Sequence, residues 1–452
     1  MVAKVNTSTV MMWGKQVGAV TWLEDRGYAI FQYASDFIRG GLDISPIHMG
    51  IEEALRGSDT FQFQLLGRKT FHGLPGLLAD SLPDKFGNAV IDAWLTRNGR
   101  HAASFSPVER LCYTGVRGMG ALEYQPAMAG RFDASVDVEI ANLVELAQDV
   151  MKIRENLDVN LGETDHENAE ALMDILRVGT SAGGARPKAV IAMNEEGRVV
   201  SGQVEAPRGY DYWILKFDGV SDIELGAPKG YGRIEYAYHL MARAAGIQMT
   251  DCRLLEENGR AHFMTRRFDR IDGQKIHMQS LCGMAHYDFN MAGAYGYEQA
   301  FATMRGIMLS KAEAQEQFRR MVFNVVARNQ DDHTKNIAFL MDQSGTWKLA
   351  PAFDITYSHN PKGQWTNQHQ MSINGKRDGF TRDDLMRIGN SITLPNTGMV
   401  IDEVIEAVSR WPTFAKEAGV DQSRAAEIAS FHRLQELAPP VVPSVGAKPK
   451  TI

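Results

Sequence analysis

Apolar residues between positions 311 and 326 recur with the three- and four-residue spacing of an α-helix that packs on a core. The residues that form this stripe are Phe318, Met321, Val322, Val325 and Val326. Directly before it, Ser310 is followed by Glu313, which fits the capping box that starts many helices. The pattern therefore predicts a helix that begins after Ser310 and buries one face.

Two short apolar runs follow this helix, at residues 337–341 and 346–350, and a glycine-containing turn separates them. Such a pair of runs predicts a β-hairpin. The polar stretch 329–336, of sequence NQDDHTKN, lies between the helix and the hairpin, and the second strand leads into Asp354. Since catalytic sites are built from polar residues on rigid supports, we expect a site here.

The N-terminal third has the alternation of short strands. Residues 9–13, 17–22 and 28–33 are β-like, and a section rich in loops is expected between residues 61 and 87. Apolar spacing between Ile140 and Met151 predicts a helix, and the polar residues after it suggest an exposed connection. We therefore expect a subdomain boundary near residue 155.

The middle of the chain combines a glycine-rich loop with further strands. The loop, within residues 177–192, runs into an apolar strand, and a second strand at 213–217 contains Lys216. A helix at 231–245 contains Glu235, and a strand at 263–268 precedes a turn.

Beyond residue 273 the pattern is mostly helical, with helices expected at 399–408 and 422–437 and a flexible proline-containing tail. The predicted divisions are 1–155, an N-terminal subdomain; 156–272, a small-lobe-like segment; 273–438, a mainly helical lobe; and 439–452, the tail.

Composition narrows the class of protein. A hydrophobic content of 44% and a charged content of 23% are ordinary for a soluble globular chain. The cysteines Cys112, Cys252 and Cys282 lack metal-type spacing, which favours a reducing cytoplasm. No apolar run reaches the roughly 18 residues of a membrane span, and no signal-peptide pattern is expected. A net charge of −7 argues against a chain that coats nucleic acid by itself, but leaves room for a DNA-binding partner.

The spacing around residues 329–354 indicates phosphoryl transfer. Protein kinases place the catalytic Asp and a metal-binding Asn five residues apart, and a second metal-binding Asp comes later. Asp331 and Asn336 have this offset, and Asp354 follows the hairpin. The usual H-R-D and D-F-G strings are absent, and a polar surface loop is the alternative interpretation. Together the elements predict an α+β chain with a two-lobed, kinase-like fold, in which an N-terminal α/β subdomain precedes a mainly helical C-terminal subdomain.

Two further features fit a kinase, each with an alternative. Lys216 could contact nucleotide phosphates and pair with Glu235, or it could be an exposed strand lysine. The glycine-rich loop could approach phosphates through its backbone amides, although it is not a Walker A loop. Its GTSAG segment also matches a hydrolase nucleophile elbow around Ser181, but such an elbow requires a following helix, and a strand is expected here.

In this order, the motifs resemble the HipA family of bacterial serine/threonine kinases, the toxin halves of HipBA toxin–antitoxin modules. The resemblance covers the whole length. It rests on residues 81–87, 113–124 and 267–270, on the Asp331-x-His-x-Lys-Asn336 string, and on the Pro-Ala-Phe-Asp run that ends at Asp354.

The resemblance implies a role for each matching residue. Asp331 would be catalytic, and Asn336 and Asp354 would bind Mg²⁺. The residues expected to contact ATP are Gly183, Gly184, Ala185, Arg186, Pro187, Lys188, Lys216, Arg266, Arg267, Phe268, His333, Thr334, Lys335, Asn336, Phe353 and Asp354. Ser181 lies where the family has its autophosphorylated serine, and Thr180 is a competing acceptor. Pro187 near the end of the loop and Arg266 in the hinge depart from the expected pattern.

The resemblance further implies a cytoplasmic kinase that uses ATP and Mg²⁺ and has a HipB-like helix-turn-helix antitoxin as partner. Operator DNA would be contacted through that complex, and the substrate would be a translation protein such as an aminoacyl-tRNA synthetase. Three alternatives stay open: a co-repressor scaffold, a small-molecule kinase of related fold, and a serine hydrolase that uses Ser181.

Overall fold

The computed structural model describes residues 4–128 except 98, 102 and 103, the single positions 140, 143, 144 and 147, and residues 187–219 and 230–439. Some of the sequence expectations lie outside these residues. They are the loop residues Gly183, Gly184, Ala185 and Arg186, the candidate phosphoacceptors Thr180 and Ser181, and almost all of the predicted tail.

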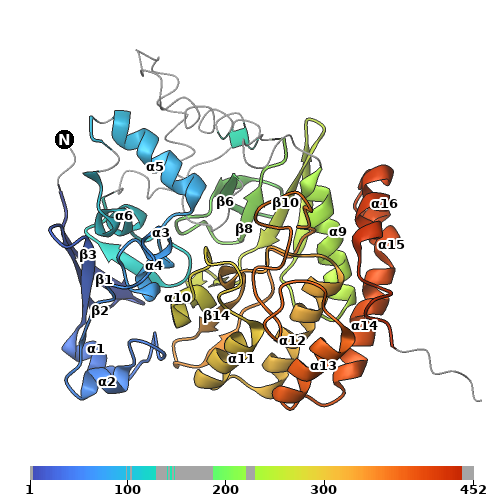
Figure 1. Cartoon of the computed structure of the whole chain (residues 1–452). Helices are drawn as coiled ribbons and strands as arrows, with labels where there is room; N and C mark the ends of the chain where they lie inside the picture. Colours follow the sequence, from blue (N-terminus) through green and yellow to red (C-terminus); the bar gives the residue numbers. More distant parts are fainter. Residues whose placement is uncertain are drawn as a thin grey trace, which may run out of the picture.

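An antiparallel five-stranded sheet lies in the N-terminal region, at the left of Figure 1. Its strand order is β4-β3-β2-β1-β5. Its strands are β1 (Thr7–Met12), β2 (Lys15–Leu23), β3 (Tyr28–Tyr33), β4 (Thr60–Phe61) and β5 (Leu122–Gln125). The three strands expected from alternation are confirmed. Residues on β1 alternate between buried and more exposed positions, which gives the sheet one face for a core.

Short helices cover this sheet. They are α1 (Ser35–Gly40), α2 (Ile51–Leu55), α3 (Arg68–Phe71), α4 (Gly76–Ala79) and α6 (Pro107–Thr114). The longer helix α5 (Lys85–Arg97) contributes to a separate core. The prediction of a loop-rich section up to residue 87 was incomplete, because α3 and α4 lie within it and α5 begins there. Helices of four residues are too short to show a helical period. The four described positions of the helix predicted after Ile140 are helical.

A second antiparallel sheet has the order β7-β6-β8-β10-β9, and the long helix α9 (Tyr231–Ala244) packs on β9 and β10 (Figure 1). Its strands are β6 (Lys188–Met193), β7 (Val199–Ser201), β8 (Asp211–Lys216), β9 (Cys252–Glu257) and β10 (Arg260–Arg266). The predicted strands and helix of this segment are confirmed. The expected turn after β10 is a small hairpin of β11 (Arg270–Ile271) and β12 (Gln274–Lys275). In the register between β6 and β8, Lys188 lies opposite Lys216.

The predicted hairpin is confirmed as β14 (Ala338–Met341) and β15 (Trp347–Leu349). It is joined by a third strand that the sequence did not predict, β13 (His277–Ser280). The helices are α10 (Leu281–Ala285), α11 (Tyr297–Gly306), α12 (Lys311–Val326), α13 (Arg382–Ser391), α14 (Thr397–Ser409), α15 (Trp411–Glu417) and α16 (Gln422–Phe431), with a 3₁₀ turn η3 (Thr334–Asn336). The capping box of Ser310 and Glu313 at the start of α12 is also confirmed.

Helix α16 ends at Phe431, six residues before the predicted end. His432 leaves the helical conformation, and the next backbone amide, of Arg433, donates to the Val326 carbonyl. A tertiary hydrogen bond therefore replaces the continuation of the helix.

Three large hydrophobic cores organise the chain. One lies among the C-terminal helices and includes all five residues of the predicted α12 stripe. A second lies under the N-terminal sheet. The third joins α5, through Val90 and Ile91, to the second sheet, through Ile191 and Leu215. The fold is thus α+β with two kinase-like lobes, and the N-terminal region packs directly on them. The residue bounds of the divisions stay a prediction.

Candidate active site

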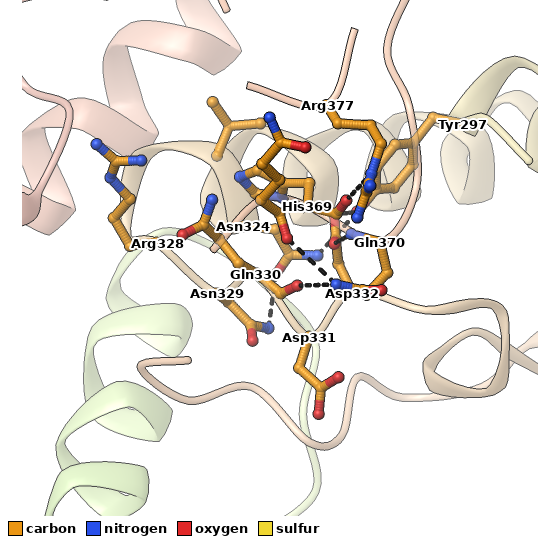
Figure 2. Close-up of polar contacts among 12 residues, drawn as sticks. Tyr297, Asn324, Arg328, Asn329, Gln330, Asp331, Asp332, His369, Gln370 and Arg377 are labelled. Carbon is orange, nitrogen blue, oxygen red and sulfur yellow. Dashed lines mark hydrogen bonds and ion pairs between the residues drawn. The ribbon is translucent and has the colours of Figure 1, made fainter. Parts of the chain in front are cut away.

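Two adjacent carboxylates after α12 have opposite environments. Asp332 is 3% exposed; it accepts hydrogen bonds from the Tyr297 hydroxyl and the Gln370 amide, both at 2.8 Å, and pairs with His369 Nδ1 at 2.9 Å. Figure 2 shows Asp331 pointing away from this cluster. The Asp331 side chain is 41% exposed and accepts one bond at 2.6 Å, from the indole of Trp365. Asp332 therefore anchors the loop, whereas Asp331 presents its carboxylate outward.

Hydrogen bonds from neighbouring elements fix the backbone of this loop. Asn329 donates through its side chain to Asn324 Oδ1 at 2.9 Å and through its backbone to the Asn324 carbonyl (Figure 2). Further along, the amide nitrogen of Asn336 donates to the backbone carbonyl of Asp331 at 2.8 Å. The hydrogen bond between Asn336 and Asp331 spans the five residues that separate them. It therefore fixes the distance between the two residues in space.

Lys216 at the end of β8 binds two carboxylates. Its Nζ lies 2.5 Å from Glu235 Oε1 on α9, and it also bonds Asp354 Oδ1. The expected pairing with Glu235 is thus confirmed. Burial alone would lower the pKa of Lys216, but Asp354 and Glu235 outweigh it and raise that pKa. Lys216 is therefore a fixed cation between the two lobes.

Asp354 stays ionised at neutral pH. Burial would raise its pKa, but the charges of Lys216 and Lys188 overcome this and lower the pKa to about 2. The residue has a positive φ of 52°, which is uncommon for a side chain other than glycine. Two residues earlier, Ala352 donates its backbone amide to the Gln248 carbonyl at 2.8 Å, which ties this part of the chain to the small lobe.

Asn336 and Asp354 line the same pocket, together with Asp332 and Phe353. Because the side-chain nitrogen of Asn336 donates to the Asp331 carbonyl, the side-chain oxygen of Asn336 is the atom left to act as an acceptor. In the described part of the chain no three His, Cys, Asp or Glu side chains form a metal cluster. Mg²⁺ commonly takes only one or two carboxylates and completes its shell with water and phosphate oxygens. An anionic carboxylate and an amide oxygen therefore fit Mg²⁺.

Several other residues expected to bind ATP lie along β6 and the end of β10. The Pro187 carbonyl accepts a hydrogen bond from the backbone amide of Phe217, and the Lys188 side chain is buried. Arg266 is partly exposed and pairs with Asp211 at 2.5 Å. The next side chain, of Arg267, is buried, so it can offer a ligand only its backbone.

Arg267 forks onto Asp269 with contacts of 2.8 and 2.9 Å. Phe268 and Phe353 bring their rings to 5.6 Å, so both of these expected residues lie at one place between the lobes.

The remaining expected residues follow Asp332. The His333 ring lies 5.3 Å from Phe289, and its Nε2 is 3.9 Å from Asp331 Oδ1. Thr334 is buried and donates to the Tyr287 carbonyl, which indicates a structural role. Lys335 places its ammonium 5.1 Å from the centre of the Phe289 ring.

Three residues of the site were not predicted from the sequence. Asp332 was not distinguished from its neighbour, although its place beside a helix end made burial plausible. Trp365 comes 34 positions after Asp331 and leaves no local signal. Asp84 lies in the 81–87 string that supports the resemblance, but no role was assigned to it; the structure places it 3.8 Å from Lys188.

Comparisons with known proteins identify the family of the chain. The family model described as the HipA-like C-terminal domain matches residues 180–434, more than half of the chain, and the HipA N-terminal domain matches residues 8–125. The chain belongs to the HipA family. This HipA-family protein also resembles a chain of the solved complex of the Shewanella oneidensis toxin–antitoxin system HipA, HipB and its operator DNA. The identity is 15%, the TM-score is 0.61, and 94% of each chain is covered, so this likeness shows the fold.

Two curated relatives come from Sinorhizobium fredii and have the names "Putative kinase Y4dM" and "Putative kinase Y4mE". The first is 25% identical over 235 residues, which cover 48% of this chain and 54% of the relative. The second is 26% identical over 190 residues, which cover 40% of this chain and 39% of the relative. The HipA-family protein thus matches about half or less of these relatives. Across the described ranges, none of its helices combines the length and apolar character needed to cross a bilayer.

Proposed function

We propose that this protein is an ATP- and Mg²⁺-dependent protein serine/threonine kinase. The observation that carries the proposal is the convergence of three chemically distinct groups between the lobes. These are the outward carboxylate of Asp331, the fixed cation Lys216, and the pair Asn336 and Asp354 in one pocket. Phosphoryl transfer is catalysed mainly by positioning and electrostatic stabilisation, and these groups suit both tasks.

Each group has a defined task. Asp331 accepts a hydrogen bond from the acceptor hydroxyl and orients it, and the Trp365 indole holds the carboxylate in place. Asn336 and Asp354 hold Mg²⁺, which neutralises phosphate charge when bound. Lys216 contacts the α and β phosphates and is oriented by Glu235.

The adenine lies against the hinge formed by Arg266, Arg267 and Phe268, which contacts it through backbone groups. Lys188 belongs to the end of the glycine-rich phosphate loop. Ser181 in that loop is the site of autophosphorylation. A phosphate there would repel the nucleotide phosphates and so switch the enzyme off.

Family membership supports a proposal for the biological setting. The kinase is the toxin of a two-component module in the cytoplasm, and its partner is a HipB-like helix-turn-helix antitoxin that brings the complex to operator DNA. The solved Shewanella complex of HipA, HipB and operator DNA supports this choice of partner. The substrate is a protein of the translation machinery, of the class of aminoacyl-tRNA synthetases.

The decisive experiment is incubation of the purified protein with γ-labelled ATP and Mg²⁺, followed by mapping of the phosphorylated residue. We expect label on Ser181 that is lost in Asp331→Ala and in the presence of a chelator. A wild-type protein that neither binds nor consumes ATP would contradict the proposal and favour the co-repressor scaffold.

A further inference from the structure

Asp84 reaches from the N-terminal region toward the second sheet. It lies just before α5, where its Oδ1 accepts the Gly87 amide at 2.6 Å. This bond caps the start of the helix and fixes the direction of the carboxylate. Its second oxygen, Oδ2, lies 3.8 Å from the Nζ of Lys188, and both side chains are about 95% buried, with exposures of 5% and 4%.

Lys188 lies at the centre of the site's charges. It stands opposite Lys216 in the register of β6 and β8. Lys216 in turn bonds the Asp354 carboxylate, so Lys188 lies next to the lysine that contacts this carboxylate. The two lysines thus lie side by side on neighbouring strands, and Lys216 is the one proposed to contact the nucleotide phosphates.

A buried ammonium requires a carboxylate, because removing an ion from water costs several kcal/mol. Lys216 has Glu235 and Asp354 within bonding distance. Burial lowers the pKa of Lys188, and Asp84 is the strongest influence in the opposite direction. Asp84 thus forms an ion pair with Lys188, at a longer distance than the 2.5 Å hydrogen bond between Glu235 and Lys216.

We propose that Asp84 is a positioning residue of the nucleotide site. It holds the Lys188 ammonium beside Lys216, so that the N-terminal region completes the phosphate-binding end of the kinase. This inference rests on the proposed function and deepens it, because it makes nucleotide affinity depend on a residue outside both kinase lobes.

Asp80 provides a matched control. It lies four residues earlier, at the end of α4, and its carboxylate accepts hydrogen bonds from the backbone and hydroxyl of Ser280 at 2.7 and 2.8 Å. Asp80 therefore joins the same two parts of the protein but bonds the start of α10 and not Lys188. A general loosening of the interface should follow from either substitution, whereas loss of phosphate binding should follow only from the one at Asp84.

The test uses the full chain and four variants: Asp84→Asn, Asp80→Asn, Lys188→Gln, and the double variant of Asp84 and Lys188. For each we would measure KM and kcat for ATP, Mg²⁺-ATP affinity by titration, and the melting temperature. Asn at position 84 can still accept the Gly87 amide, so the cap is kept. We expect Asp84→Asn to raise the ATP KM roughly tenfold with a smaller change in kcat. Asp80→Asn should lower the melting temperature and leave the KM near the wild-type value.

The double variant shows whether Asp84 acts through Lys188. If it does, adding Asp84→Asn to Lys188→Gln leaves the KM within about twofold of Lys188→Gln alone, because the effects of coupled residues do not add. This comparison also decides the matter if Asp84→Asn does not fold, since the double variant leaves no unpaired buried charge. Additive effects, or a wild-type KM in Asp84→Asn, would overturn the inference while the kinase proposal stands. A wild-type protein without ATP binding would overturn both.

Discussion

Replacing Asp331 and Asp332 by Asn, one at a time, should affect two different properties. We expect Asp331→Asn to lower the rate of phosphoryl transfer and Asp332→Asn to lower the free energy of unfolding. Asp331 is largely free of the surrounding structure, since it accepts a single side-chain hydrogen bond, from Trp365, which the Asn amide oxygen can still accept. We therefore expect Asp331→Asn to change the free energy of unfolding by only about 0.5 kcal/mol. A positioned catalytic carboxylate contributes roughly 10²–10⁴-fold to the rate, so phosphoryl transfer should fall by that factor.

Asp332→Asn should have the reverse effect. Both carboxylate oxygens of Asp332 face hydrogen-bond donors, the Gln370 amide on one and the Tyr297 hydroxyl on the other. The new amide group must place its own N–H groups against one of these donors, and an unsatisfied buried donor costs about 1–3 kcal/mol. Asn also lacks the negative charge that strengthens the hydrogen bonds to the Asp332 carboxylate. We therefore expect Asp332→Asn to lower the free energy of unfolding by about 2–4 kcal/mol.

Chemical denaturation of the ligand-free variants would measure stability, and initial rates of phosphate transfer at saturating Mg²⁺-ATP would measure chemistry. The rate per folded molecule should be far lower in Asp331→Asn than in Asp332→Asn. An active Asp331→Asn, or an inactive but fully stable Asp332→Asn, would show that the assignment of the two carboxylates is wrong.

Three further variants test other contacts. Trp365→Phe keeps an aromatic ring but removes the donor to Asp331, so steady-state kinetics should show kcat about tenfold lower and an unchanged ATP KM; a wild-type kcat would contradict the positioning role. Glu235→Gln removes one of two carboxylates on Lys216, and titration with Mg²⁺-ATP should show affinity about tenfold weaker, or about 1.4 kcal/mol; unchanged affinity would refute this. Burial lowers the pKa of His277 to about 4, from an ordinary value of 6.5. The folded state therefore binds this proton less readily than the unfolded chain, and the stability is complete above pH 6.5 and declines as the pH falls toward 4. Between pH 7 and pH 5 the wild type should lose roughly 2 kcal/mol more than His277→Gln in denaturation experiments, and equal losses would contradict the assignment.

Local patterns in the sequence predicted the elements that support the site. The capping box of Ser310 and Glu313 and the apolar stripe of α12 involve residues three or four positions apart, so they are visible without a fold. The five-residue spacing of Asp331 and Asn336 is equally local, and the structure closes it with one hydrogen bond. Features formed by residues that are close together in the sequence could therefore be predicted.

The partners of these residues could not be predicted, because the fold brings them from distant positions. Asp332 is held by Tyr297, 35 positions earlier, and by Gln370, 38 positions later. The sequence also did not predict in which direction a side chain points. Arg266 and Arg267 were both expected at the hinge, but one is exposed and the other is buried on Asp269. Arg266 is the last residue of β10 and Arg267 follows it, and the sequence does not show which of the two side chains is buried.

Buried polar links make the N-terminal region part of the kinase core. Asp269 accepts the Gly120 amide at 2.7 Å and lies between Arg267 and Arg270. Burial would raise the pKa of Asp269, but the two guanidinium groups hold it well below its usual range. Asp80 on Ser280 and Asp84 on Lys188 cross the same boundary.

Breaking such buried ionic contacts costs about 3–5 kcal/mol where one partner is left unpaired. The N-terminal region and the kinase lobes should therefore unfold together rather than as independent domains. The proposed phosphate site then lies at the junction of three structural parts, the N-terminal region, the second sheet and the 329–336 loop, and its geometry depends on all three remaining packed.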